Sequence, residues 1–129
     1  MSPPSLLLIA DPDEDLCAQV QTWLTPYFQV ESAHTLQAAY QHCQQTTPDF
    51  LVLEAGRFPD GRGIDLIPPL REIHPALWIC CYSMHNGITD KVQAFQRGVD
   101  NYLVKTITRE RFVLHMRIAR HRLLALRAV

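Results

Sequence analysis

The sequence predicts an α/β fold in which helices cover both faces of a parallel sheet of five strands. Short apolar runs alternate with amphipathic helical patterns five times along the chain, and this alternation is typical of parallel strands joined by helices. The run at residues 6–10 is apolar throughout, as expected for a strand buried on both faces. A length of 129 residues fits one domain. We therefore expect a single doubly wound domain over residues 1–129.

Each of the five units contributes one expected strand and one expected helix. The expected strands are residues 6–10, 28–32, 50–55, 78–82 and 102–104. The expected helices are residues 13–25, 35–45, 64–74, 88–97 and 109–127. Because proline is tolerated only in the first helical turn, Pro68 and Pro69 predict that the third helix is short and begins near Pro68, or is distorted. Residues 56–63 are rich in glycine and are expected to form a loop of turns.

Charge is divided unevenly along the chain, although the net charge is only −1. Residues 1–107 contain six Lys or Arg and twelve Asp or Glu, a balance of −6, whereas residues 108–129 contain six Arg and one Glu, a balance of +5. The small net charge gives no global field that would attract nucleic acid or a membrane. The basic charge is instead concentrated in the last expected helix.

The four cysteines are expected to be buried, reduced thiols. They are Cys17, Cys43, Cys80 and Cys81. None of them has C-x-x-C spacing, and neighbours on a strand point to opposite faces of the sheet. The chain shows no secretory signal pattern and no apolar run of about 18 residues. We therefore expect a cytoplasmic protein.

Four polar side chains follow four of the expected strands. They are Asp11, Glu54, Ser83 and Lys105. In open parallel sheets, function is located outside the carboxyl ends of the strands. The sequence therefore predicts that these four residues share one site.

The chain resembles the receiver domains of response regulators, the CheY-like superfamily, over nearly its whole length. The resemblance is carried by Asp11 after the first strand and by the segments 48–54, 59–66, 82–84 and 98–105, of which the last is the most specific. It implies a flavodoxin-like sheet with strand order 2-1-3-4-5. It also implies a site in which an Asp accepts phosphate, an acidic pair holds Mg²⁺, and a Lys neutralises charge on the transferring group.

Several residues depart from the family pattern. Ala10 replaces the first residue of the acidic pair, and Glu54, one methylene longer than Asp, stands at the phospho-acceptor position. The following loop is one residue longer than is usual, so an alternative register places Ala55 there. Thr106 replaces a proline after Lys105, and because a non-prolyl cis bond costs about 3 kcal/mol we expect the Lys105–Thr106 bond to be trans.

These departures favour a degenerate pseudo-receiver, a domain that keeps the receiver fold and binds a signalling partner without phosphorylation. It would be no enzyme and would need no cofactor. The alternative is an atypical but functional receiver that accepts phosphate from a histidine kinase, and that alternative requires Mg²⁺. The six histidines show no metal-ligand cluster, so Asp11 is the single, weak candidate metal ligand.

The individual site residues leave alternatives open. Asp11 is either a residual metal ligand or the cap of the first helix with Pro12 at its first position. Glu54 either pairs with Lys105, as an acyl phosphate would, or is a partly solvated carboxylate. Ser83 and Tyr102 either keep the coupling that switches receivers or are structural, in which case the Tyr102 hydroxyl is wet.

The last helix is expected to bury one apolar stripe and to present a second surface. The stripe is Phe112, Met116, Ala119 and Leu123. The candidate interaction face is Arg117, Arg120, Leu124 and Leu126. The helix would reach about 28 Å at 1.5 Å per residue, so its end could project and serve a homodimer or a protein partner. The resemblance points to a binding face made by the fourth helix, the fifth strand and this helix; a nucleic-acid partner is not expected.

Overall fold

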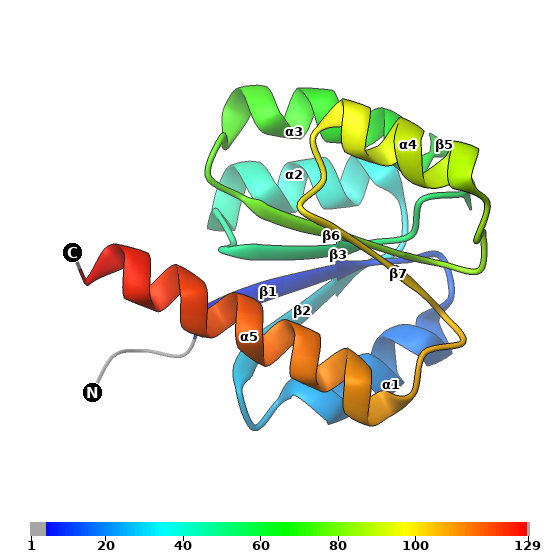
Figure 1. The fold of residues 1–129 in the computed structure, drawn as a ribbon. Helices are drawn as coiled ribbons and strands as arrows, with labels where there is room; N and C mark the ends of the chain where they lie inside the picture. The colour runs from blue at the N-terminus through cyan, green and yellow to red at the C-terminus, as the bar shows by residue number, and fades with distance from the viewer. Residues whose placement is uncertain (1–4, 129) are drawn as a thin grey trace.

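The computed structural model describes residues 5–128 and shows one parallel sheet covered by helices on both faces (Figure 1). The five strands are β1 (Ser5–Ala10), β2 (Phe28–Ala33), β3 (Phe50–Leu53), β6 (Trp78–Ser83) and β7 (Asn101–Val104). Their order across the sheet is β2-β1-β3-β6-β7, and every neighbouring pair is parallel. Because β6 and β7 are the fourth and fifth strands of this sheet along the chain, this is the predicted order 2-1-3-4-5. The predicted fold class and strand order are therefore confirmed.

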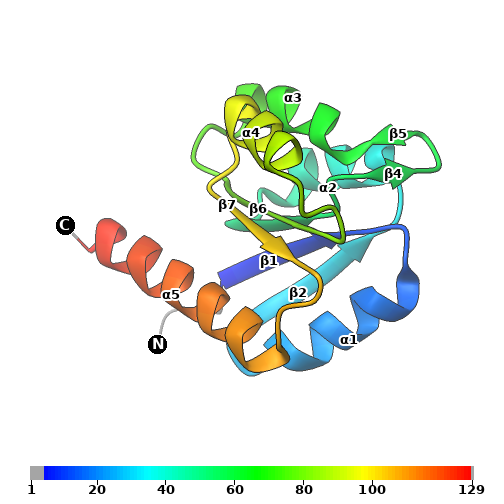
Figure 2. The same ribbon diagram turned by 45° about the vertical axis from the view of Figure 1, so that its right-hand side comes forward.

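The helices are divided between the two faces of the sheet. Helices α1 (Glu14–Leu24) and α5 (Arg109–Arg127) lie on one face, and α2 (Leu36–Thr46), α3 (Ile67–Ile73) and α4 (Ile88–Arg97) lie on the other (Figures 1 and 2). Within the described residues, no helix is both long and apolar enough to cross a membrane. The edge strand β7 runs between α4 and α5, which places these three elements along one side of the molecule.

Alternate side chains of each strand enter two separate hydrophobic cores. Cys81 belongs to the core under α2, α3 and α4, and its neighbour Cys80 belongs to the core under α1 and α5. In the second core the rings of Tyr82 and Phe112 stack with centroids 4.6 Å apart. All four cysteines are buried and free, and burial raises the pKa of the Cys17 thiol to about 12. These thiols are as the sequence predicts.

The segment between β3 and α3 differs from the expected loop of turns. It forms a small antiparallel hairpin, β4 (Arg57–Phe58) and β5 (Gly61–Arg62), followed by one 3₁₀ turn over Gly63–Leu66. Strands of two residues are too short to show alternation in a sequence, so the pattern could not reveal them. Helix α3 then begins at Ile67 with both prolines in its first turn, which confirms the short helix that Pro68 and Pro69 predict.

Helices α4 and α5 bury very different amounts of apolar surface. Of the residues of α4 only Ala94 is buried, and the apolar side chains of Ile88, Val92 and Phe95, which share one face, are exposed to solvent. Helix α5 buries its predicted stripe: Phe112, Met116 and Ala119 are buried, and Leu123 packs half-buried against them. The end of α5 lies beyond the strands, as expected, but Arg127 forms an ion pair with Asp49 (Figure 1).

Gly63 is a position where the fold excludes any side chain. A Cβ atom added there would lie 1.7 Å from the carbonyl oxygen of Glu54. We predict that Gly63→Ala lowers the free energy of unfolding by about 3 kcal/mol or more, because the backbone of the hairpin must move away from β3. Chemical denaturation measures this. Gly87→Ala is the matched control, since its Cβ meets only the flexible Asp90 carboxylate at 3.0 Å; equal losses in the two variants would contradict the explanation.

Candidate functional site

Three charged side chains meet at the carboxyl edge of the sheet. The Lys105 Nζ atom lies 2.8 Å from Asp11 Oδ2 and 2.7 Å from Glu54 Oε1. All three side chains are largely buried, at 15 %, 3 % and 13 % exposure respectively. The structure thus brings together Asp11, Glu54 and Lys105, which directly follow strands β1, β3 and β7, through two ion pairs of Lys105, one with Asp11 and one with Glu54.

Backbone hydrogen bonds fix the three chain segments that carry these side chains. The Glu54 N–H donates to the Ala10 carbonyl at 2.9 Å, and the Lys105 N–H donates to the Ser83 carbonyl at 2.9 Å. The second Glu54 carboxylate oxygen, Oε2, accepts the Gly56 N–H at 3.0 Å. The site is therefore part of the sheet ladder and the turn that follows it, which restricts how far any of the three groups can move.

The pKa values of the three groups follow from burial opposed by pairing. Burial raises the pKa of Glu54, but hydrogen bonds from Lys105, Ser83 and Gly56 outweigh it and hold that pKa below its usual value. For Asp11, burial wins over Lys105 and the pKa is raised. Burial lowers the pKa of Lys105, but Asp11 and Glu54 more than compensate, so the pKa is raised. Lys105 and Glu54 are thus both charged at neutral pH.

Asp11 does not cap the first helix. The N-cap of α1 is Asp13, whose Oδ1 atom accepts the Leu16 N–H at 3.1 Å. Asp11 instead accepts the Asp13 N–H at 2.8 Å through Oδ1 and binds Lys105 through Oδ2. The capping interpretation of Asp11 is therefore wrong, because Pro12 lies one position before the cap rather than in the helix.

The donor set fits Mg²⁺ poorly. Mg²⁺ needs carboxylate and water oxygens in octahedral geometry, whereas here one ammonium group already takes an oxygen from each of the two carboxylates. Ala10 is fully buried and offers no ligand atom. Within residues 5–128, no group of three or more His, Cys, Asp or Glu side chains is arranged to hold a metal ion.

Ser83 and Tyr102 both lie inside the molecule. Ser83 is fully buried, and Tyr102 is only 8 % exposed. The Tyr102 hydroxyl donates a hydrogen bond to the His85 carbonyl at 2.7 Å, so the interpretation that leaves it wet is wrong. This bond joins the edge strand β7 to the loop that leads into α4, which a strand position alone could not reveal.

The connection after Lys105 follows the path that the sequence predicts. No peptide bond among the described residues is cis, so the Lys105–Thr106 bond is trans, as the cost of a non-prolyl cis bond requires. The Lys105 ammonium nevertheless reaches the two carboxylates.

The candidate interaction face on α5 is not one face. Arg117 lies over the Tyr27 ring at 4.3 Å, on the side of α5 toward α1. Arg120 and Leu124 are half-buried. Leu126 is 73 % exposed and lies on the opposite side, where it lines a groove with Asn101 of β7. The helical pattern identifies the buried stripe but not which flank each remaining residue joins, so this grouping is wrong.

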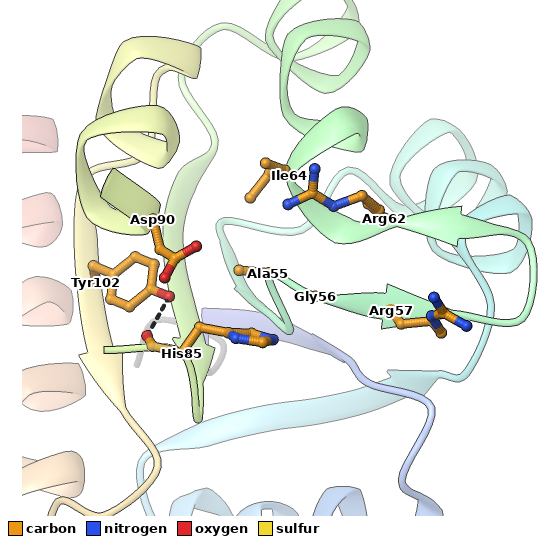
Figure 3. Close-up of a pocket in the computed structure, with 8 residues that line it drawn as sticks. All are labelled: Ala55, Gly56, Arg57, Arg62, Ile64, His85, Asp90 and Tyr102. Carbon is orange, nitrogen blue, oxygen red and sulfur yellow. Dashed lines mark hydrogen bonds between the residues drawn. The ribbon is translucent and has the colours of Figure 1, made fainter. Parts of the chain in front are cut away.

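A pocket beside Glu54 was not foreseen from the sequence. It has a volume of about 250 Å³ and is lined by Ala55, Gly56, Arg57, Arg62, Ile64, His85, Asp90 and Tyr102 (Figure 3). Its walls are the β4–β5 hairpin and the segment from the end of β6 into α4. The hairpin was expected to be a loop, so nothing in the sequence indicated that its two arginines would face a cavity.

Comparison with known proteins assigns the family. Residues 7–117 match the response regulator receiver domain family. The chain belongs to the response regulator receiver family. It is 30 % identical over 115 residues to the transcriptional regulatory protein PrrA of Mycobacterium leprae, covering 88 % of this chain and 47 % of PrrA. It is 30 % identical over 116 residues to the transcriptional regulatory protein KdpE of Mycobacterium tuberculosis, covering 89 % of this chain and 50 % of KdpE.

This receiver chain spans about half the length of those curated relatives. In three dimensions it resembles the CheY-like receiver domain protein from Methanospirillum hungatei, with a TM-score of 0.85 over 91 % of this chain and 94 % of that one, at 16 % identity. Receiver domains of response regulators are signalling modules of two-component systems, generally without enzymatic activity of their own. The family assignment therefore makes signal transduction the general role of this chain.

We predict that Lys105→Met destabilises the domain most at neutral pH. Without the ammonium group, burial and mutual repulsion raise the folded-state pKa values of Asp11 and Glu54 above their unfolded values. The loss in unfolding free energy, about 3 kcal/mol at pH 7, should then shrink as the pH falls through those raised pKa values and both carboxyls take up protons. Denaturation from pH 7 to pH 4 measures it. Lys91→Met on α4 is the control; a loss that does not depend on pH would contradict the assignment.

Proposed function

We propose that this chain is a pseudo-receiver, which binds a signalling partner without being phosphorylated. The observation that carries the proposal is the ion pair between Glu54 and Lys105, with Nζ and Oε1 2.7 Å apart. In the family, the lysine neutralises charge that phosphorylation brings to the acceptor. Here a carboxylate of the chain itself meets that lysine, so the site already holds an anion that is paired with Lys105.

The chemistry of phosphoryl transfer is poorly supported by the same residues. The extra methylene of Glu54 moves the attacking oxygen, and an error of about 1 Å in an attacking group can cost about 10²-fold in rate. Glu54 Oε1 and Oε2 are bound to Lys105 and to the Gly56 N–H. Ala10 removes one carboxylate from the acidic pair that would hold Mg²⁺. We therefore propose that no cofactor is needed.

The surface proposed for the partner is the α4–β7–α5 side. On α4, Ile88, Val92 and Phe95 are 81 %, 47 % and 48 % exposed. On α5, Ile118 and Leu126 are 42 % and 73 % exposed and line one groove with Asn101 of β7. Exposed apolar residues gathered along one side of a small domain mark an interaction site more often than scattered ones do. A protein partner in the cytoplasm, or a second copy of the chain, would bury them.

We predict that the chain takes no phosphate and binds Mg²⁺ no better than millimolar. The reason is the misplaced Glu54 carboxylate and the missing acid at Ala10. Incubation with acetyl phosphate and Mg²⁺, followed by mass spectrometry of the intact protein, measures it. A stoichiometric phosphoryl adduct on Glu54 would overturn the proposal in favour of an atypical functional receiver.

The double variant Ala10→Asp and Glu54→Asp is the matched comparison in that experiment. It restores the acidic pair and the shorter acceptor, so it should take up more phosphate than the natural sequence does. Because Asp at residue 54 reaches less far toward Lys105 than Glu does, and because Thr106 and the longer loop remain, acceptance should still be poor. An adduct on the natural sequence as strong as that on the double variant would show that Ala10 and Glu54 do not disable the site.

We predict that the double variant Val92→Ser and Phe95→Ser weakens association about tenfold or more, because it removes apolar area from the proposed binding side. Sedimentation measures self-association, and a pull-down from native cell extract measures binding of a partner. Ile73→Ser on α3 is the control, since Ile73 is also exposed, at 41 %, but lies on a different helix. Unchanged association of the double variant, with a normal thermal melt, would move the binding surface elsewhere.

A further inference from the structure

The two arginines of the β4–β5 hairpin occupy paired backbone positions, and neither forms an ion pair among the described residues. Arg57 and Arg62 are directly paired across the hairpin, and like charges in this position destabilise a strand pair. The fold therefore concentrates positive charge at a place where a bound anion would relieve the repulsion.

Both arginines line the pocket of about 250 Å³ beside Glu54. Figure 3 shows the Arg62 side chain, the His85 ring and the Asp90 carboxylate reaching into the same space from the hairpin, from the loop after β6 and from α4. Arg57 lies further along the hairpin, at the edge of the pocket. Convergence of side chains from three separate segments on one cavity is the usual form of a small-ligand site.

The hairpin wall of the pocket is held at both ends. At its tip the Asp60 carboxylate accepts the Leu36 and Gln37 N–H groups of α2, at 2.9 and 3.0 Å. At its base the Gly63 N–H donates to the Gly56 carbonyl at 2.8 Å. The arginines are thus carried by a fixed piece of backbone, which lowers the cost of ordering them around a ligand.

The opposite wall is held as well. The His85 carbonyl accepts the Tyr102 hydroxyl at 2.7 Å, and the His85 ring lies so close over Gly56 that a Cβ there would come within 3.0 Å of Nε2. Because Gly56 has no side chain, the His85 ring can lie directly over it at the bottom of the pocket. A ligand in contact with His85 would touch the loop that leads into α4. The hydrogen bond from the Tyr102 hydroxyl to the His85 carbonyl connects that loop to β7.

Among the described residues that line the pocket, Asp90 carries the carboxylate, and it opposes anion binding. It lies in the first turn of α4, where a negative charge is favourable for the helix, and its carboxylate lies over Gly87. Counted over the lining residues alone, two guanidinium groups against one carboxylate leave an excess of one positive charge. The Lys105 ammonium cannot add to it, because Asp11 and Glu54 already bind that group.

We infer that this pocket, which is separate from the Glu54–Lys105 pair, binds a small oxyanion that carries phosphate or carboxylate groups. Arg62 is the principal residue that binds the anion through charge-assisted hydrogen bonds, and Arg57 contributes from the edge of the pocket. The volume of about 250 Å³ limits the ligand to a small molecule. The bound anion contacts the loop that carries His85. Because this loop leads into α4, the anion influences the position of α4. This inference goes beyond the proposed function, since it holds or fails whether or not Glu54 accepts phosphate.

Titration of the full chain with inorganic phosphate and, in a second arm, with malonate tests the inference. Amide NMR shifts report where each anion binds, and chloride is held constant because exposed charge pairs are screened by salt. We expect saturable shifts at Gly56, Ile64 and His85, and the arm with the stronger binding identifies phosphate or carboxylate as the preferred group. Shifts that centre on Asp11 and Lys105, or no saturable shift up to tens of millimolar, would overturn the inference.

Charge variants sharpen the same titration. Arg62→Gln should weaken binding about tenfold and Arg57→Gln by less, because a charge-assisted hydrogen bond is lost or a nearby charge is removed. Asp90→Asn should strengthen binding severalfold, since it removes the opposing charge. Arg111→Gln and Asp15→Asn are matched controls on exposed faces of α5 and α1 and should change nothing. If Arg62→Gln and Arg111→Gln weakened anion binding equally, the binding would depend on the overall charge of the protein. That result would contradict a specific site in the pocket.

Discussion

One ammonium group between two buried carboxylates holds the carboxyl edge of this sheet together. Lys105 comes from the end of the edge strand β7, Asp11 from β1 and Glu54 from β3, so its two ion pairs, at 2.8 and 2.7 Å, span the sheet from the edge to the centre. Removing water from two carboxylates is costly unless a cation lies between them. The loops that surround the site, including the one that leads to the hairpin and the one that leads to α4, are arranged around this ion-paired cluster.

The fold could be predicted from the sequence because its strands are apolar runs and its helices have clear periodicity, and the same pattern placed Asp11, Glu54, Ser83 and Lys105 at one edge. The finer features depend on where the chain turns. The cap of α1 is Asp13, two residues after Asp11. Hydrophobic periodicity contains no information about strands of two residues, so the sequence predicts a loop where the structure has the hairpin and its arginines.

Helix α5 shows a different limit of sequence patterns. Its apolar stripe predicts which residues are buried, and the structure does bury Phe112, Met116 and Ala119. The residues beside such a stripe belong to one of two flanks, and a single helix contains no information about which neighbour each flank meets. Only the packed structure shows that Arg117 lies against Tyr27 while Leu126 lies toward β7. The exposed stripe of α4 is ambiguous in the same way, since an amphipathic pattern does not distinguish a core from a binding surface.

The buried cysteines have a practical consequence for spectroscopy. A thiol reacts with maleimides and iodoacetamides as its thiolate. Burial raises the pKa to about 12 for Cys17 and Cys81 and to about 11 for Cys43, and it also raises the pKa of Cys80 well above its usual value. At neutral pH almost none of these thiols is ionised, and none is accessible. A single cysteine introduced on the surface of α4 can therefore carry a spin label or a fluorophore selectively while the native four stay in place, so distances to α4 become measurable in the otherwise natural chain.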